Sequence, residues 1–201
     1  MSGNESDNQT IFTLSEDEII ERLRTDDKDI IETIHGMCLD LVYKEDDRTK
    51  SLDAKASTLL GMSGLSSSVV FTLGGLLIDK ISNISLPLIG CPLPWLVFFY
   101  ISSSATLLLS ILFALLSVMA RSDWRYFKDA DIFQGDMIDA GERPYKRYLS
   151  VHAWKIFQNN FAINEKKGSL LRKGHLLFFA GLAQLLPIII IIAAYTFAKG
   201  G

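Results

Sequence analysis

Three histidines are the side chains in this sequence best suited to bind a metal or transfer protons. His35, His152 and His175 lie far apart, and none has another His or Cys at a spacing typical of metal ligands. His175 directly precedes a long apolar block, where an amphipathic ring is common at a membrane boundary. We therefore expect no metal site.

Two serine triplets, 66–68 and 102–104, are the other candidates for chemistry, as nucleophiles. No base accompanies either triplet to activate a hydroxyl. The sequence contains no GxxxxGK[ST] phosphate loop, no GxSxG motif and no HExxH motif. Small hydroxyl residues are common where helices pack in lipid. We therefore expect no catalytic residue, no cofactor and no enzymatic activity.

The apolar residues of the chain are gathered into three long blocks. They cover residues 56–78, 93–120 and 176–198, and none contains a charged residue. Each reaches the roughly 20 residues needed to cross about 30 Å of hydrocarbon as a helix. A chain of 201 residues leaves too little sequence to cover three such blocks in a soluble core. The predicted fold is an all-α integral membrane protein with three transmembrane helices and cytoplasmic helical extensions.

The distribution of Lys and Arg predicts the orientation of these helices. Lys80 is the single Lys or Arg in the loop 79–92, whereas the segment 121–175 carries eleven Lys or Arg. We expect a multi-pass protein of the plasma (inner) membrane, with the N-terminus in the cytoplasm and the C-terminus outside. Cys38 and Cys91 then lie on opposite sides and form no disulfide. A net charge of −3 indicates no nucleic-acid partner.

The segments outside the blocks are predicted to be mostly helical. Residues 1–14 are polar and expected to be disordered. Residues 15–55 predict a short helix and then a longer one, capped by Asp26 or Asp27, that runs straight into the first block. Its apolar residues form one stripe: Ile30, Ile31, Ile34, Met37, Cys38, Leu41 and Val42.

The segment 121–175 begins with short helical pieces and loops, because Gly135 and Gly141 interrupt its pattern. Pro144 is well placed as the first residue of a new helix that continues into the third block. This helix and the one before the first block each carry an apolar stripe that needs a partner. Either the two stripes pack together as a stalk, or one of them binds another protein.

Small residues four positions apart indicate close helix packing in the first two blocks. The pairs are Ser57 with Gly61, Gly64 with Ser68, and Ser110 with Ala114. They fit packing within one three-helix bundle or assembly between subunits. Gln184 is the strong hydrogen-bonding residue near mid-depth, and Pro187 is predicted to kink the third helix. Since the blocks contain no ionisable residue, we expect a pore formed by assembly or a passive anchor rather than a coupled transporter.

Two short motifs resemble those of the Pycsar effector transmembrane family. The run from Asp53 to Leu60 (DAKASTLL), which includes Lys55 and Ala56, resembles the D-x-K-A-x-x-L-L junction that opens the family's first transmembrane helix. Asn160, Asn164, Lys167 and Leu171 resemble the N-x-x-x-N-x-x-K-x-x-x-L stretch before its last helix. The resemblance covers residues 30–198. Gly174 departs from it, because the family often has alanine there.

The resemblance implies a prokaryotic inner-membrane effector of antiviral defence that responds to a cyclic-nucleotide signal. We expect a homo-oligomer in the lipid bilayer that assembles and impairs the membrane on activation. The best-known members carry a separate cyclic-nucleotide-binding domain, whereas the cytoplasmic segments here are helical in pattern; this favours a nucleotide-sensing or cyclase partner. The alternative is a non-enzymatic membrane adaptor whose cytoplasmic helical stalk recruits a partner protein.

Asp53 and Lys55 stand where the first transmembrane helix leaves water. They are two residues apart and cannot face each other on one helix. We expect Asp53 to pair instead with Lys167, Arg172 or Lys173 near the start of the third block. Such a pair would tie two helices together at the inner boundary of the membrane.

Overall fold

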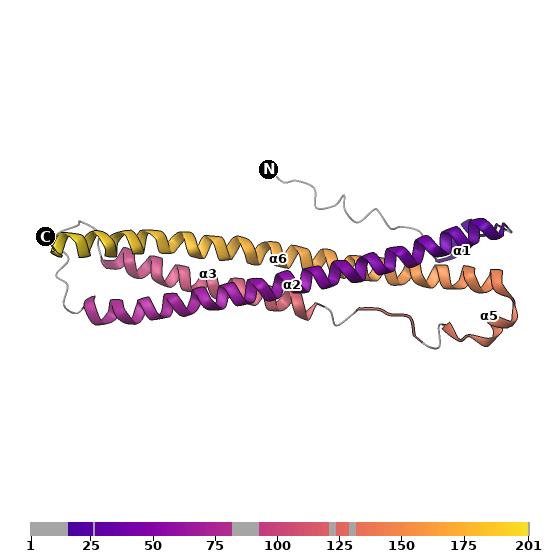
Figure 1. The fold of residues 1–201 in the computed structure, drawn as a ribbon, viewed down its shortest axis with the longest axis horizontal. Coiled ribbons are helices and arrows are strands. Elements are labelled where there is room, and N and C mark those ends of the chain that lie inside the picture. Colours follow the sequence, from indigo (N-terminus) through magenta and orange to yellow (C-terminus); the bar gives the residue numbers. More distant parts are fainter. Residues whose placement is uncertain (1–15, 26, 82–92, 121–123, 129–131, 201) are drawn as a thin grey trace. The chain divides into compact units, whose positions relative to one another are not determined.

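The structure, a computed structural model, describes residues 16–25, 27–81, 93–120, 124–128 and 132–200, and most of these residues are helical. These residues form α1 (Glu16–Arg22), α2 (Lys28–Ile81), α3 (Leu93–Met119), α5 (Gly135–Asp139) and α6 (Glu142–Gly200), with no strand among them (Figure 1). The predicted all-α fold is confirmed. The predictions for residues 1–14 and for most of the loop 79–92 lie outside the described residues.

Helix α2 runs without a break from Lys28 through the whole first apolar block, as the sequence predicted. Its first turn is capped by Asp27, whose Oδ1 accepts hydrogen bonds from the backbone N–H groups of Asp29 at 2.9 Å and Ile30 at 3.4 Å. A carboxylate in this position satisfies N–H groups that have no partner within the helix. Asp27 is therefore the N-cap of α2.

Helix α6 also continues without a break into the third apolar block and ends at Gly200. It begins at Glu142, so the expectation that Pro144 is its first residue is wrong by two positions. A proline fits anywhere in the first turn, because the first four N–H groups of a helix have no intrahelical partner. Gly141, with φ of 101°, occupies the turn before it. Pro187 lies inside the helix, and its kink stays a prediction.

Three of the described helices, α2, α3 and α6, are long and apolar enough to cross a membrane. Their apolar stretches each exceed the roughly 20 residues that span the hydrocarbon of a bilayer. The chain is therefore an all-α multi-pass membrane protein, as the sequence predicted.

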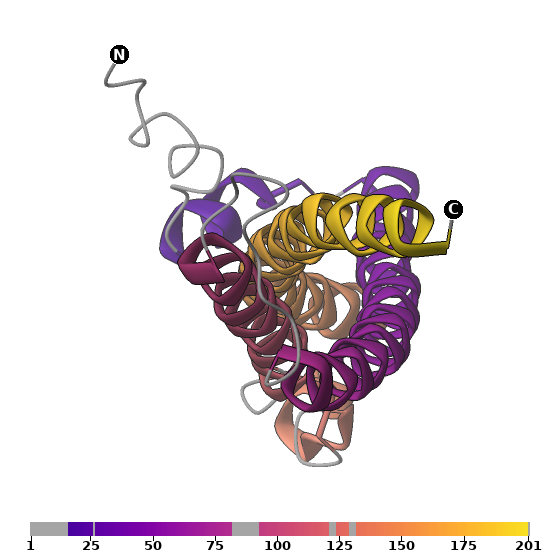
Figure 2. The ribbon, with the colours of Figure 1, turned by 90° about the vertical axis from the view of Figure 1, so that its left-hand side faces the viewer.

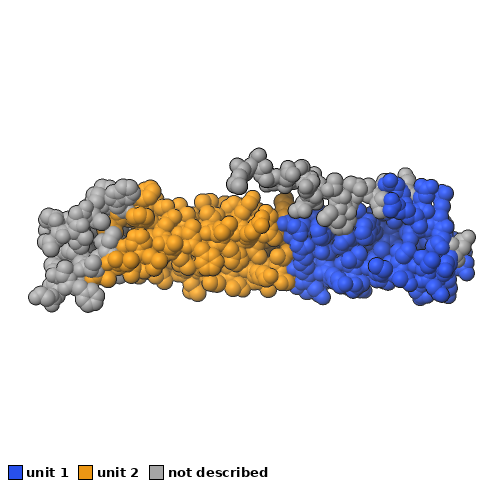
Figure 3. Space-filling model, turned by 90° about the horizontal axis from the view of Figure 1, so that it is seen from above, with its two compact units in different colours: residues 1–50, 122–165 blue, residues 51–121, 166–201 orange. Residues whose placement is uncertain are grey.

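The chain divides into two compact units, coloured separately in Figure 3. Unit 1 comprises residues 1–50 and 122–165, and unit 2 comprises residues 51–121 and 166–201. Helices α2 and α6 contribute to both units, α3 belongs to unit 2 and α5 to unit 1.

Unit 2 is a bundle of three helices around a common core (Figure 2). Its buried positions alternate in steps of three and four residues, which is the spacing of a left-handed coiled coil. On α6 these positions are Lys167, Leu171, Gly174, Phe178, Gly181, Leu185 and Ile188. On α3 they are Leu96, Ser103, Leu107, Ser110, Ala114 and Ser117.

In unit 1 the apolar stripe of α2 is buried in part, because Ile30 and Met37 are exposed, and the stripe of α6 is buried or half-buried. Ile31 and Cys38 are buried on α2, and Val151, Ile156 and Phe157 on α6. Hydrogen bonds between the two helices accompany this burial, and their residues are described with the site below. The arrangement fits the alternative in which the two stripes pack against each other.

Candidate functional site

The predicted ion pair at the start of the spans is present in unit 2. Lys167 Nζ lies 2.7 Å from Asp53 Oδ1. The lysine side chain is 0% exposed and the aspartate side chain 27% exposed. The pair joins α2 to α6, and Lys167 is the partner that the structure selects among the three candidates. Lys55 and Ala56, the neighbouring motif residues, are exposed and buried respectively.

Three serines of α3 extend this contact into the bundle. Ser117 Oγ donates to the carbonyl of Lys167 at 3.2 Å, Ser110 Oγ to that of Gly174 at 2.9 Å, and Ser103 Oγ to that of Gly181 at 2.8 Å. The donors are seven residues apart, and so are the acceptors. We call these three hydrogen bonds the serine series.

Helix α2 joins the serine series through Ser63, whose Oγ lies 3.1 Å from Ser110 Oγ. Each hydroxyl has a single proton to donate. Because Ser110 donates its proton to Gly174, Ser63 must donate to Ser110. All three helices thus meet in one hydrogen-bonded layer, in which every hydroxyl proton has an acceptor.

The glycines of α6 permit this close approach. A Cβ at Gly174 would lie 2.9 Å from Leu59 Cδ2, and a Cβ at Gly181 would lie 2.9 Å from both Leu107 Cγ and Thr106 Oγ1. Small residues at such positions let helix backbones come close enough for side chains to reach a neighbouring carbonyl. Gly174, the departure from the family pattern, is therefore a packing position of this chain.

The predicted small-residue pairs have two different environments. Ser110 and Ala114 are fully buried in the core of unit 2. Ser57, Gly61 and Ser68 are exposed, and Gly64 is half-buried. The hydroxyls of Ser57 and Ser68 donate to carbonyls four residues earlier in α2, at 3.0 Å each. The pair of Ser110 and Ala114 therefore lies inside the bundle, whereas the pair of Ser57 and Gly61 lies on its outer face.

In unit 1 the two asparagines of the second family motif are buried and fully engaged. Asn164 Nδ2 donates to Glu45 Oε2 at 2.6 Å and to the Glu45 carbonyl at 3.0 Å, and its Oδ1 accepts from Thr49 Oγ1 at 2.9 Å. Burying amide and carboxylate groups is unfavourable unless they are hydrogen-bonded. These bonds fix α2 against α6 in a single register.

Asn160 holds a segment that has no regular secondary structure. Its Oδ1 accepts the Arg125 N–H at 3.0 Å, and its Nδ2 donates to the Arg125 carbonyl at 3.0 Å. One side chain therefore satisfies both backbone groups of Arg125, as a neighbouring strand would. This contact fixes residues 124–128 against α6.

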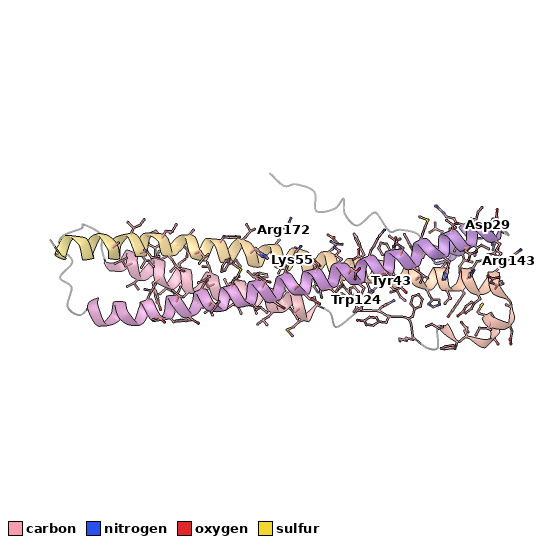
Figure 4. The ribbon with its side chains drawn as sticks, viewed as in Figure 1. Asp29, Tyr43, Lys55, Trp124, Arg143 and Arg172 are labelled. Carbon is pink, nitrogen blue, oxygen red and sulfur yellow. The ribbon has the colours of Figure 1, made fainter. Side chains whose placement is uncertain are left out.

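A pocket of about 210 Å³ lies beside this contact within unit 1. Its walls are largely apolar and aromatic, with Asp46, Arg125 and Asn160 as the polar members. Its aromatic residues are Tyr43, Trp124, Tyr126 and Phe127. Tyr43 comes from α2 and Trp124 from the extended segment (Figure 4). Pockets of this composition accept small molecules or protruding side chains.

Two ionisable groups of unit 1, Arg48 and Cys38, have pKa values raised by their surroundings. Arg48 is bonded to Glu165, lies 3.6 Å from Glu45 and stacks over the ring of Phe161 at 5.5 Å. Burial lowers the pKa of Arg48, but these carboxylates raise it above its ordinary value. Burial also raises the pKa of the Cys38 thiol. Both groups are therefore held in the protonation state that is inert at neutral pH.

No set of three His, Cys, Asp or Glu side chains within the described residues could hold a metal ion. His35 Nδ1 lies 3.3 Å from Ser150 Oγ, and His175 Nδ1 lies 2.9 Å from the Leu171 carbonyl. Gln184 Oε1 is buried with no hydrogen-bond partner. The absence of catalytic and cofactor-binding residues stays a prediction.

Sequence reasoning missed Glu45, Thr49 and the acceptors of the serine series. A signal for the series was available: Ser103, Ser110 and Ser117 recur every seven residues, and Gly174 and Gly181 share that spacing. Seven residues are two turns of a coiled-coil helix, so such residues lie on one face.

A comparison with protein families identifies a family that this chain matches. The model of a family described as the Pycsar effector protein domain matches residues 39–196 of this chain. The match includes α3 and the apolar parts of α2 and α6, together with all the polar contacts between Glu45 and Gly181 described above. No curated protein and no solved structure matches the chain.

Proposed function

Because the chain belongs to the Pycsar effector protein family, we propose that it assembles and impairs the inner membrane on activation, as a membrane effector of antiviral defence. The family match over most of the chain is the observation that carries this function. It supports a non-enzymatic effector, and the three membrane-spanning helices supply its contact with the bilayer. We further propose that the activating signal arrives through a nucleotide-sensing or cyclase partner.

The outer face of α2 supports assembly between copies. The serine series satisfies polar groups inside the bundle, whereas Ser57, Gly61 and Ser68 are exposed on the first span. A Cβ added at Gly61 would meet no atom within 4 Å. Small exposed residues let a second helix approach closely in lipid. We therefore assign the homo-oligomer contact to this face.

Controlled expression in bacteria tests the proposal. We expect depolarisation, measured with a voltage-sensitive dye, and uptake of a DNA stain that intact cells exclude. Gly61→Leu should reduce both, because its side chain fits the single bundle but obstructs the outer face. Gly36→Leu is the matched control, since its Cβ also meets open space but lies outside the apolar blocks. If the wild-type chain, expressed together with its nucleotide-sensing or cyclase partner, caused neither depolarisation nor stain uptake, the result would contradict the proposal.

The aromatic pocket of unit 1 favours a second candidate, the non-enzymatic membrane adaptor. Tyr43 is exposed at the pocket, and its aromatic neighbours could accept a side chain of a partner protein. On this hypothesis expression is harmless. In a pull-down, the full chain should then retain one dedicated partner protein, bound through residues 15–50. Tyr43→Ala should then abolish the retention, whereas Lys44→Ala, on the adjacent exposed residue, should preserve it.

A further inference from the structure

Four cations of unit 2 are exposed at the start of its apolar helices. They are Lys55 on α2 and Lys166, Arg172 and Lys173 on α6. Within the part of the chain that the structure describes, none of the four forms an ion pair. Lys167, in the same stretch, differs because it is buried and bonded to Asp53. The pair with Asp53 neutralises the inward cation and leaves the outward ones uncompensated.

Five cations of unit 1 have the opposite arrangement. Exposed or half-exposed Lys28, Lys44, Arg48, Lys50 and Lys146 each lie within 4.0 Å of a carboxylate oxygen. The difference follows from sequence, because residues 166–201 contain no Asp or Glu at all. A cation without an acidic neighbour is available to an external anion.

Contacts within unit 2 place the four cations at one end of the bundle. Lys167 lies opposite Asp53, and Gly174 lies against Leu59. In this register Lys55 lies between the levels of Lys167 and Gly174, and Arg172 and Lys173 lie within the same interval. A helix rises about 1.5 Å per residue, so these charges fall within about 10 Å along the bundle. Figure 4 labels Lys55 and Arg172, which come from different helices.

The surface next to the cations is suited to acyl chains. Leu176 and Phe179 follow Arg172 by four and seven residues, so the three side chains share one face of α6. Leu176 is 66% exposed and Phe179 is 62% exposed. A guanidinium followed along the helix by exposed apolar side chains matches the layout of a phospholipid, in which the phosphate lies at the membrane surface and the acyl chains lie deeper.

We propose that Lys55, Lys166, Arg172 and Lys173 form a binding site for the headgroup of an anionic phospholipid. The phosphate is held by the unpaired cations, and the acyl chains lie along Leu176 and Phe179. Clusters of basic residues directly beside a membrane span attract anionic headgroups by about 1 kcal/mol for each cation, which corresponds to about fivefold in affinity. The site holds lipid whether or not the chain disrupts membranes, so it is independent of the proposed function.

Lipid binding to the purified full chain tests the proposal. In neutral detergent, phosphatidylglycerol and phosphatidylcholine with identical acyl chains are added, and bound lipid is counted by native mass spectrometry. We expect a preference for phosphatidylglycerol and a rise in melting temperature with that lipid alone. The variant K55Q/R172Q/K173Q should lose preference by about fivefold for each cation removed and keep its binding of phosphatidylcholine.

Two matched variants make the result specific. K28Q/K44Q/K50Q removes three cations from unit 1 and should keep the preference for phosphatidylglycerol. An equal loss of preference in this variant would show that net charge alone causes it and would overturn the proposal. K55R/R172K/K173R conserves the charge and should bind like the wild type, which separates charge loss from misfolding. An equal rise in melting temperature with millimolar inorganic phosphate, or with an acidic peptide, would overturn the assignment to lipid.

Discussion

Lys167 and Asp53 form an ion pair across two helices, in which the ammonium is completely buried and the carboxylate is partly open to solvent. A buried cation is tolerated only with an anion and further hydrogen bonds around it. The Lys167 carbonyl accepts the Ser117 hydroxyl, so all three helices of unit 2 are connected at this level. The two residues belong to different family motifs, and their contact explains why both motifs stand at the start of membrane helices.

Removing one partner of this pair should destabilise the bundle strongly. Asp53→Ala leaves Lys167 buried without its anion, and we expect a loss of about 3 kcal/mol in the free energy of unfolding. Thermal unfolding in detergent measures it. The exchanged pair Asp53→Lys with Lys167→Asp should recover part of the loss. A double variant no more stable than the worse single variant would show that the ion pair is not what Asp53 contributes.

The glycines of α6 should respond to alanine according to the space around them. Gly168→Ala meets no atom within 4 Å, so it should stabilise the protein by about 0.5–1 kcal/mol through helix propensity. Gly181→Ala should destabilise it by about 1–2 kcal/mol, because its Cβ meets Leu107 Cγ and Thr106 Oγ1 at 2.9 Å. Gly174→Ala should fall between them, since its nearest atom is the movable end of Leu59. Chemical unfolding of the three variants, compared side by side, tests this order.

Sequence periodicity was sufficient to predict the helices that are built on apolar side chains. The three spans and the continuous helices α2 and α6 follow from uninterrupted apolar or amphipathic runs. Charge and position narrowed the partner of Asp53 to Lys167, Arg172 or Lys173, and the structure selects Lys167.

The polar interior was not predictable in the same way. Glu45 is a charged residue beside other charged residues, a pattern typical of a solvated face, yet it is buried against Asn164. The contact of Asn160 with Arg125 joins a helix to a segment without periodicity, and only the folded chain brings them together. Ser57 with Gly61 fits the pattern of small residues four positions apart as well as Ser110 with Ala114 does. The pattern does not say which face of a helix is buried, so it could not separate the exposed pair from the buried one.

The contact between Asn160 and Arg125 predicts a local change in protease sensitivity. Asn160→Leu removes both hydrogen bonds that attach the Arg125 backbone to α6. We expect faster tryptic cleavage after Arg125 and faster amide exchange there, with little change at Arg48 on α2. Asn160→Asp keeps the acceptor for the Arg125 N–H but loses the donor, and should give an intermediate rate. Equal cleavage rates in all three proteins would show that α6 does not hold the segment through this side chain.

His35 predicts how unit 1 responds to acid. Burial lowers the pKa of His35 and the nearby ammonium of Lys146 lowers it further, while Glu32 opposes them. In the unfolded chain the ring titrates near its ordinary value of 6.5, so below that pH the unfolded state binds a proton that the folded state does not. Stability therefore decreases as pH falls through 6.5 and towards the folded pKa. Amide exchange in residues 31–42, measured between pH 5 and 7.5 and corrected for intrinsic rates, should show this loss. His35→Gln should flatten the acid slope, and an unchanged slope in that variant would assign the pH dependence to other groups.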